Sequence, residues 1–213
     1  MNYKNIILLF VTVFMSTSIW AQTKKAEQIL DELTHKTNSL DNIKVSFSYK
    51  MSNKEAGIDE ATNGTLLVSG DKYRLNIAGQ EIICDGKTLW TYLADSEEVQ
   101  INDVSEEDGF SPSKLLSSYN EDYTAKRDKD ITKDGKTFYK LKLKPKDKDS
   151  NFDYVILTID ADLMQLSDFI IFDFDDNIFT YEIKQFITNS NIPDDSFTFD
   201  TSKYPNVEVI DMR

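Results

Sequence analysis

Cys84-Asp85-Gly86-Lys87-Thr88-Leu89-Trp90-Thr91-Tyr92 is the stretch of sequence that decides the fold. An Asp-Gly pair between two apolar runs is a strong hairpin signal, because both residues tolerate the positive φ angles of tight turns. Here the pair separates the apolar residues 82–83 from an apolar and aromatic run at residues 89–92. Successive side chains of a strand point to opposite faces, so Trp90 and Tyr92 share one face. The stretch therefore predicts two antiparallel strands, the second of which presents two large aromatic side chains together.

A period of two runs through other parts of the chain as well. Apolar residues alternate with polar or charged ones in residues 44–51, 72–77, 139–144 and 178–184. Strands with one apolar and one charged face are typical of an antiparallel sheet that has one side in water. Roughly ten short strands at close spacing predict a barrel or a strongly curved sheet. Turn signals fall between the apolar runs at Asn63-Gly64, Gly70-Asp71, Asp134-Gly135 and Asp175-Asp176-Asn177.

Two segments, residues 152–159 and 169–174, are apolar in both phases and are predicted to be covered on both faces. Over residues 24–40, apolar side chains recur at steps of three and four, which predicts an amphipathic helix. In the long connection at residues 106–120, Ser111-Pro112 supplies an N-cap and a first position for a short helix. The predicted fold is α+β and mostly antiparallel β: a curved sheet, apolar and aromatic inside, with both helices across its mouth.

The first residues have the three-part layout of a cleavable signal peptide. Lys4 supplies the positive charge, residues 6–15 form a short apolar region, and small residues follow. We therefore expect a signal peptide over residues 1–21 and a single mature domain over residues 22–213. An uncleaved anchor is the alternative, although the apolar region is short for a membrane span of about 20 residues. The intact mass of the purified protein distinguishes the two.

The whole chain carries a formal net charge of −13. This acidity argues against nucleic acid as a partner, because binding to nucleic acid depends on Lys and Arg that neutralise phosphates. It also argues against stable residence on an anionic membrane surface and leaves only transient membrane contact. Cys84 is the only cysteine, so no intramolecular disulfide can form, and we expect a buried, inert thiol.

The sequence gives no support for catalysis or for a metal site. His35 is the only histidine and occupies a polar stretch of the predicted helix, and the chain has no Gly-x-Ser-x-Gly motif. Residues 173–177, followed by Glu182, resemble a calcium loop only loosely, because Ile178 stands where such a loop needs glycine. One cysteine and one histidine are too few for the usual zinc site. We therefore expect a protein without enzymatic activity, metal or cofactor.

Taken in order, the motifs of the chain resemble those of the LolA family, the periplasmic carriers that take lipoproteins to the outer membrane. The stretch from Asp85 to Tyr92 is similar to the family's D-G-K-x-L-W-x-Y, and Pro112 to Leu116 is similar to the P-x-x-L-L of its lid. The resemblance implies an unclosed half-barrel whose aromatic, apolar hollow is covered by helices. Further similar motifs lie at residues 45–50, 64–68, 141–146, 152–159, 166–181, 192–199 and 207–211.

The resemblance also implies a function, namely binding of the acyl chains of lipoproteins that are released from the inner membrane. The implied partners are acylated lipoproteins, an inner-membrane ABC-type lipoprotein-release complex and an outer-membrane acceptor, all met in the periplasm. The lid is predicted to present Phe110, Leu115 and Leu116. We expect the acyl-chain cavity to be lined by Phe47, Tyr49, Tyr73, Leu75, Trp90, Tyr92, Phe179 and Tyr181.

One position departs from the family pattern. The family usually has Arg-Pro-Gly before the strand that corresponds to residues 73–77, and its Arg holds the lid closed through hydrogen bonds. This chain has Ser69-Gly70-Asp71 there, and Arg74 lies on the polar phase of its strand, so we do not assign that role to it.

Two other classes of function remain open. One is a binding protein for other lipids or glycolipids, or an acyl-sensing module of the envelope-stress response; the other is a structural or adaptor module whose hollow is simply core.

Overall fold

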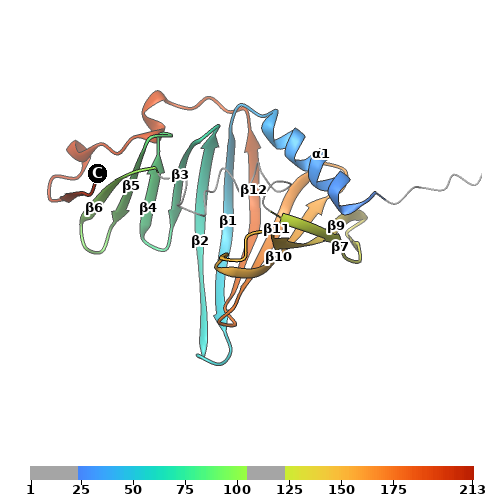
Figure 1. The fold of residues 1–213 in the computed structure, drawn as a ribbon. Helices are drawn as coiled ribbons and strands as arrows, with labels where there is room; N and C mark the ends of the chain where they lie inside the picture. Colours follow the sequence, from blue (N-terminus) through green and yellow to red (C-terminus); the bar gives the residue numbers. More distant parts are fainter. Residues whose placement is uncertain (1–23, 105–122) are drawn as a thin grey trace, which may run out of the picture.

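The computed structural model describes residues 24–104 and 123–213, in which thirteen strands form one sheet (Figure 1). Its strands are β1 (Ile43–Asn53), β2 (Ile58–Ser69), β3 (Lys72–Ile77), β4 (Gln80–Cys84), β5 (Thr88–Leu93), β6 (Glu98–Asp103), β7 (Tyr123–Arg127), β8 (Ile131–Lys133), β9 (Lys136–Pro145), β10 (Phe152–Asp160), β11 (Gln165–Asp173), β12 (Ile178–Thr188) and β13 (Glu208–Asp211). The order across the sheet is β13-β6-β5-β4-β3-β2-β1-β12-β11-β10-β9-β7, and β8 pairs with β9 outside this order.

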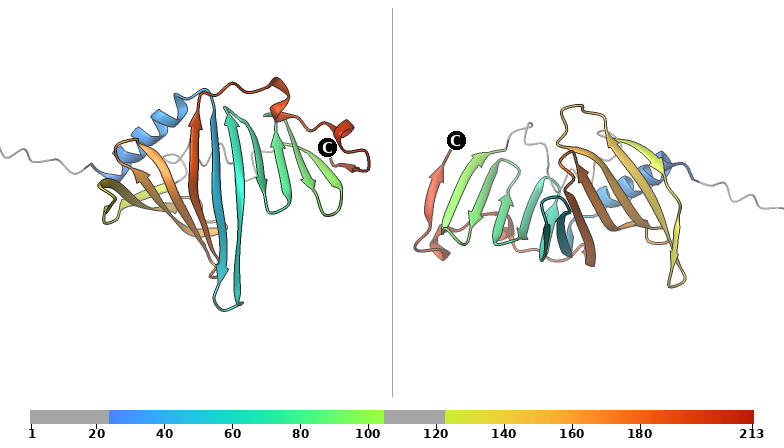
Figure 2. Two further views of the ribbon diagram at one scale, coloured as in Figure 1. Left: turned by 180° about the vertical axis from the view of Figure 1, so that it is seen from behind. Right: turned by 90° about the horizontal axis from the view of Figure 1, so that it is seen from below.

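Neighbouring strands of this sheet are antiparallel, except that β13 runs parallel to β6. The two ends of the strand order, β13 and β7, do not pair with each other, so the curved sheet stays open (Figure 2). The predicted fold, a mostly antiparallel and unclosed half-barrel with a helix, is confirmed.

The helix α1 (Ala26–Asn38) begins after Lys25, whose backbone N–H donates to the side-chain oxygen of Gln28 at 3.0 Å. It packs over the half of the sheet that contains β7 and β11 (Figure 1). The helix predicted over residues 24–40 is therefore confirmed, with slightly shorter ends. Its apolar stripe is the face it buries, formed by Ala26, Ile29, Leu30 and Leu33.

We define the inner face of the sheet as the face on which α1 packs, and the outer face as the opposite one. Beneath α1 the core contains fully buried residues of β9 and β10, among them Leu141, Leu157 and Ile159. Residues 155–160 are buried in both phases, as predicted for a strand covered on both sides. The second such segment is covered only in part, because Phe174 at its end is 66% exposed.

The Asn63-Gly64 pair does not form the predicted turn. Both residues lie inside β2, where Gly64 is paired with Phe47 of β1 and with Ile77 of β3. A Cβ atom at Gly64 would lie 2.4 Å from Cζ of Phe47 and 2.8 Å from the backbone oxygen of Asn76. Glycine stands here because the phenyl ring of Phe47 occupies the space of a side chain.

Gly64→Ala is therefore expected to lower the free energy of unfolding by about 1–3 kcal/mol, the usual cost of overpacking a buried site. The added methyl group must displace either the buried ring of Phe47 or the neighbouring backbone. Asn63→Ala, at the exposed neighbouring position, should stay within about 0.5 kcal/mol of the wild type. Urea unfolding measures both, and equal midpoints for the two variants would contradict this account of the glycine.

Residues 189–213 follow β12 and cross the outer face of β3 to β6, and we call them the strap (Figure 1). The strap contains two short 3-10 helices, η1 (Asp194–Phe197) and η2 (Thr201–Lys203), before β13. Beneath it lies a second core cluster, in which the fully buried Ile83 and Val99 contact Phe199 of the strap. The end of the chain thus covers part of the outer face in this half of the sheet.

Arg74 fastens the strap to the sheet. Its Nε donates to Oε1 of Glu81 at 2.8 Å, and its Nη1 donates to the backbone oxygen of Ser196 at 3.1 Å. The hydroxyl of Tyr204 donates to the other oxygen of Glu81 at 3.3 Å. Arg74 therefore acts on the outer face, consistent with the polar phase on which the sequence places it.

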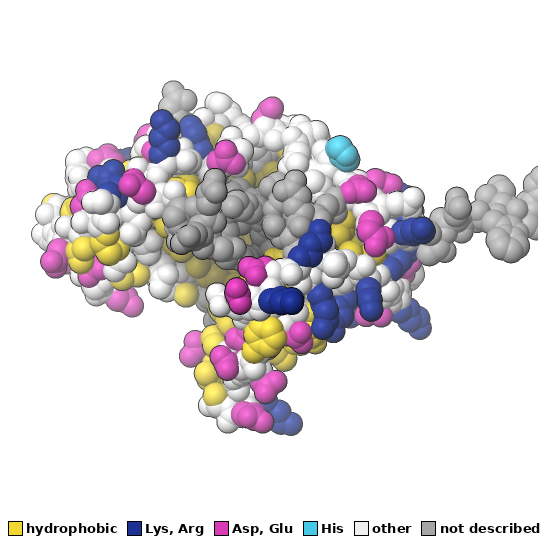
Figure 3. Space-filling view, in the orientation of Figure 1, with side chains coloured by type: hydrophobic (Ala, Val, Ile, Leu, Met, Phe, Trp, Pro, Cys, Tyr) yellow, Lys and Arg dark blue, Asp and Glu magenta, His cyan; other side chains and the backbone are white. Residues whose placement is uncertain are grey.

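Two surface features complete the description. The hairpin of β1 and β2 projects as an arm that carries both hydrophobic and acidic side chains, and Lys and Arg gather on the β7–β9 side (Figure 3). Lys140, Lys142 and Lys144 share the outer face of β9, and Lys126 of β7 lies opposite Lys142.

Across the described ranges, no helix combines the length and the apolar character that crossing a membrane requires.

Candidate functional site

The inner face of β2, β3 and β4 is built from aliphatic and aromatic residues in direct register. Leu75 of β3 lies between Leu66 of β2 and Ile82 of β4, and Tyr73 is paired with Cys84. Leu66, Tyr73 and Ile82 belong to the same apolar cluster as the buried face of α1. Tyr73 and Leu75 therefore face the interior that α1 partly covers.

An aromatic cluster continues this inner face at the middle of the sheet. The ring of Tyr181 on β12 stacks on Phe169 of β11, with centroids 4.4 Å apart and planes at 9°. The rings of Tyr49 and Phe47 on β1 approach Tyr181 at 5.1 and 5.8 Å. Phe179 lies two residues before Tyr181 and packs against the same apolar cluster. Tilted and offset ring pairs at these distances are favourable beyond the area they bury.

The residues of this face differ in how much surface they leave free. Phe47 and Tyr73 are 6% and 8% exposed and serve as core. The other four predicted residues on the inner face are half-buried, so part of each side chain remains open to a ligand: Tyr49, Leu75, Phe179 and Tyr181.

The hydroxyls of Tyr49 and Tyr181 on this face stay neutral at physiological pH. Burial raises the pKa of Tyr181 well above its usual value, and the neighbouring Tyr49 raises it further. Burial also raises the pKa of Tyr49, with a smaller contribution from Glu60. The aromatic part of the inner face is therefore an uncharged, mostly apolar surface.

Trp90 and Tyr92 do not face this interior, and the prediction that they would share it with Phe179 and Tyr181 is wrong. Cys84 pairs with Leu89, which puts Leu89 on the inner face, whereas Trp90 pairs with Ile83 on the outer face. Trp90 and Tyr92 pack in the second core cluster beneath the strap. Both phases of β5 are apolar, so the sequence alone does not reveal which phase turns inward.

The hairpin that carries these residues is itself confirmed. Oδ1 of Asp85 accepts hydrogen bonds from the backbone N–H groups of Lys87 at 2.9 Å and Thr88 at 2.8 Å. Gly86 adopts φ of 92°, a conformation that favours glycine. Cys84, just before the turn, is 2% exposed as expected, and burial raises the pKa of its thiol.

The inner face also contains residues, next to the predicted ones, that the local sequence pattern does not single out. Leu66 and Ile82 flank Leu75 in the sheet, Leu89 follows on β5, and Phe169 stacks on Tyr181. Each lies in an apolar run of the sequence, and assigning it to the inner face requires the register of the strands. Pairing across the Gly70-Asp71 turn, for example, already places Leu66 beside Leu75.

Arg127 of β7 holds the start of α1 on this face. Its Nη1 donates to the backbone oxygen of Lys24, directly before the helix, and its guanidinium also pairs with Asp130. The same guanidinium lies over the ring of Tyr139 at 4.8 Å from the centroid. No local sequence pattern predicts this contact, because it joins residues far apart in the chain.

Other predicted positions lie away from the inner face. The lid residues Phe110, Leu115 and Leu116 fall outside the described residues. His35 is exposed on α1. Residues 173–177 form a hairpin turn in which Oδ1 of Asp173 accepts backbone N–H groups at 2.9 and 2.8 Å. In the part of the chain that the structure describes, no group of three or more His, Cys, Asp or Glu is placed to hold a metal ion.

Comparison with known proteins identifies related chains. The sequence model described as "Outer membrane lipoprotein carrier protein LolA" matches residues 38–200. The chain is 28% identical to an outer-membrane lipoprotein carrier protein of Pasteurella multocida, over 95% of this chain and 94% of that protein. It is 31% identical to such a protein of Psychromonas ingrahamii, over 54% of this chain and 56% of that one.

A solved structure shares the fold. An uncharacterised conserved protein of Thermus thermophilus superimposes with a TM-score of 0.57 at 11% sequence identity, over 87% of this chain and 98% of that protein. At this identity the likeness extends to the arrangement of the strands and the helix alone.

Proposed function

This chain belongs to the LolA family of outer membrane lipoprotein carrier proteins, and from that premise we propose that it binds the acyl chains of lipoproteins and shuttles them through the periplasm. The lipoproteins come from the inner membrane and are delivered to the outer membrane. The protein acts by binding and release, without chemical change to its cargo.

The observation that carries the proposal is the half-buried apolar surface of the inner face, formed by Tyr49, Leu75, Phe179 and Tyr181. Each methylene group that leaves water gains about 0.8 kcal/mol. An acyl chain of about 15 methylenes therefore gains on the order of 10 kcal/mol when it is sheltered, which outweighs its entropic cost. An uncharged face of this kind suits such a ligand better than any polar substrate.

Release of the cargo is as important as binding. Contacts between an acyl chain and an apolar face are soft and non-directional, so no fixed set of hydrogen bonds must be broken for the chain to leave. The lid predicted around Phe110, Leu115 and Leu116 would cover and uncover this face, and this role remains a prediction.

We further propose that an inner-membrane ABC-type complex loads the protein and that an outer-membrane acceptor unloads it. Contact with a membrane would be transient, because the net charge of −13 is repelled by anionic lipid. The lysines on the outer face of β9 offer a local exception through which the protein can approach such a surface.

The cheapest test is mass spectrometry of the mature protein purified from its native periplasm. Co-purified acylated polypeptides are the expected result. Free lipids or glycolipids alone would favour the lipid-binding alternative. If neither lipids nor acylated polypeptides co-purify, the result would favour a structural module whose inner face is only core.

A photo-crosslinking residue sharpens this test. Placed at Leu75 on the inner face, it should form adducts with lipoprotein in the cell, whereas at Leu67, half-buried on the outer face of β2, it should not. Equal labelling at both positions would contradict the proposed binding face.

A further inference from the structure

Polar side chains of five adjacent strands lie in one straight row across the outer face. In register, Ser46 of β1 lies opposite Thr65 of β2, Thr65 opposite Asn76 of β3, Asn76 opposite Glu81 of β4, and Glu81 opposite Tyr92 of β5. Neighbouring strands are about 4.8 Å apart, so the row extends over roughly 19 Å.

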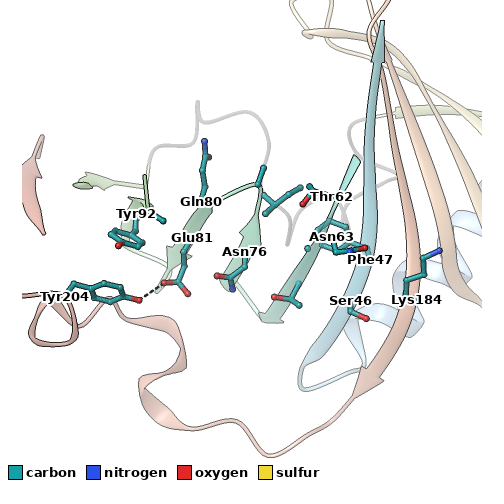
Figure 4. Close-up of a pocket in the computed structure, with 16 residues that line it drawn as sticks. Ser46, Phe47, Thr62, Asn63, Asn76, Gln80, Glu81, Tyr92, Lys184 and Tyr204 are labelled. Carbon is teal, nitrogen blue, oxygen red and sulfur yellow. Dashed lines mark hydrogen bonds between the residues drawn. The ribbon is translucent and has the colours of Figure 1, made fainter. Parts of the chain in front are cut away.

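The row forms the floor of an open cavity of about 650 Å³ (Figure 4). The end of the β3–β4 hairpin, residues 77–80, and Tyr204 of the strap border it, and Phe47 and Lys184 lie at its other end. Pockets for small ligands commonly have volumes of 300–1,000 Å³. The row lies on the opposite face of the sheet from Leu75 and α1, and the four half-buried residues of the proposed acyl-binding face do not line this cavity.

The charged groups of this cavity are already paired within the protein. Glu81 accepts hydrogen bonds from Arg74 at 2.8 Å and from Tyr204 at 3.3 Å. Nζ of Lys184 lies 2.7 Å from a carboxylate oxygen of Glu182. A charged ligand would have to displace one of these partners, so the cavity favours an uncharged one.

The uncharged polar side chains, in contrast, have hydrogen-bonding capacity to spare. Within residues 24–104 and 123–213, the side chains of Ser46, Thr65 and Asn76 make no hydrogen bond, although Ser46 and Asn76 are half-buried. Hydroxyl and amide groups both donate and accept, which matches a ligand whose own groups do the same. The backbone groups beneath them are used in the strand ladders, so an extended peptide cannot bind here as an added strand.

An aromatic platform closes one end of the row. The rings of Tyr92 and Tyr204 have centroids 4.7 Å apart, and Phe199 stacks behind Tyr204 at 4.7 Å with planes at 17°. Phe199 stacks on the ring of Tyr204, and the hydroxyl of Tyr204 donates a hydrogen bond to Glu81, so the ring has a fixed position at the edge of the cavity. Such a ring can pack against the C–H face of a pyranose.

We infer that this outer-face cavity binds a neutral oligosaccharide. The hydroxyls of the saccharide exchange hydrogen bonds with Asn76, Thr65 and Ser46, and one of its rings packs on Tyr204. The row extends over several sugar rings, so the ligand is a short chain and not a monosaccharide. A free glycan and the headgroup of a glycolipid share this chemistry.

The test is titration of the ¹⁵N-labelled mature protein with maltotetraose and, separately, with chitotetraose. Saturable shifts of the backbone amides of Thr65, Asn76 and Glu81 are expected with at least one of them. Asn76→Ala and Tyr204→Leu should each weaken the affinity about tenfold or more. Asn102→Ala, the same change on the inner face of β6, should bind as the wild type does. Urea unfolding checks that Asn76→Ala stays folded.

Failure of both saccharides to bind the wild type would overturn the inference, as would binding that Asn76→Ala leaves unchanged. A second titration with an alkyl glycoside of the same saccharide separates the two sources of the ligand. Equal affinity for the glycoside and the saccharide indicates a free glycan, and tighter binding of the glycoside indicates a glycolipid headgroup. The outcome does not depend on the lipoprotein-carrier role, because Asn76→Ala should retain wild-type affinity for a fatty-acid probe.

Discussion

Leu75→Asp is expected to weaken the binding of a fluorescent fatty acid at least about tenfold while changing the free energy of unfolding by less than about 1 kcal/mol. Leu75 is half-buried at the centre of the inner face, so its carboxylate replacement can stay hydrated in the empty protein. When an acyl chain covers that position, the charge must lose its water without gaining a partner. Probe displacement and urea unfolding measure the two effects.

The matched control is Leu67→Asp, the same substitution on the outer face of β2. Leu67 is also half-buried, and it lies opposite Arg74 in the sheet, so the new carboxylate has a cation nearby. Probe affinity should therefore be that of the wild type. Tyr181 is a poorer choice for this experiment, because its stacking on Phe169 makes any substitution a test of folding. If Leu75→Asp binds the probe normally, the inner face is not the acyl site.

Ile83→Ala is expected to cost about 2–4 kcal/mol of stability, the usual price of deleting a large fully buried side chain. Ile83 lies at the centre of the second core cluster, between the sheet and Phe199 of the strap. The cavity should loosen the strap, so limited proteolysis within residues 189–213 should become faster than in the wild type. Affinity for the fatty-acid probe should not change, because Ile83 faces away from the inner surface.

Ile82→Ala, one residue earlier, reverses this pattern. Ile82 is half-buried on the inner face beside Leu75, so its loss should cost less stability and should reduce probe binding. Adjacent isoleucines thus report separately on the two faces of one strand. Identical behaviour of the two variants in both assays would contradict the assignment of Ile82 to the acyl-binding face and of Ile83 to the core beneath the strap.

The regular parts of the fold follow directly from local pattern. The three- and four-residue spacing of residues 24–40 predicts α1, and the alternation in residues 72–77 predicts β3 with Tyr73 and Leu75 on its apolar face. These predictions succeed because one face of each element is buried and the other is exposed to water. Apolar and polar residues therefore recur with the period of the helix or strand. The turn at Asp85-Gly86 succeeds for a similar reason, since its conformation restricts the residues that can occupy it.

The failures arise where both faces of an element are covered. In β5 the two phases are equally apolar, because the strap buries Trp90 and Tyr92 while Leu89 points inward. The strap itself has no periodic pattern, and its aromatic residues gain their partners only from strands distant in the chain. Gly64 misleads for another reason: its small size accommodates the ring of Phe47, and the backbone there is extended.

The pairing of β1 with β12 has a consequence for the order of folding. From β1 to β6 each strand pairs with the next in the chain, whereas the β1–β12 seam brings Ile43 opposite Thr188. Closing so long a loop reduces the entropy of the chain before any favourable contact forms to offset the loss. Pairing between strands distant in the chain is slow for this reason. When the chain is synthesised from its N-terminus, one edge of β1 therefore stays unpaired until residues 178–188 have been made. Formation of this seam is the expected rate-limiting event.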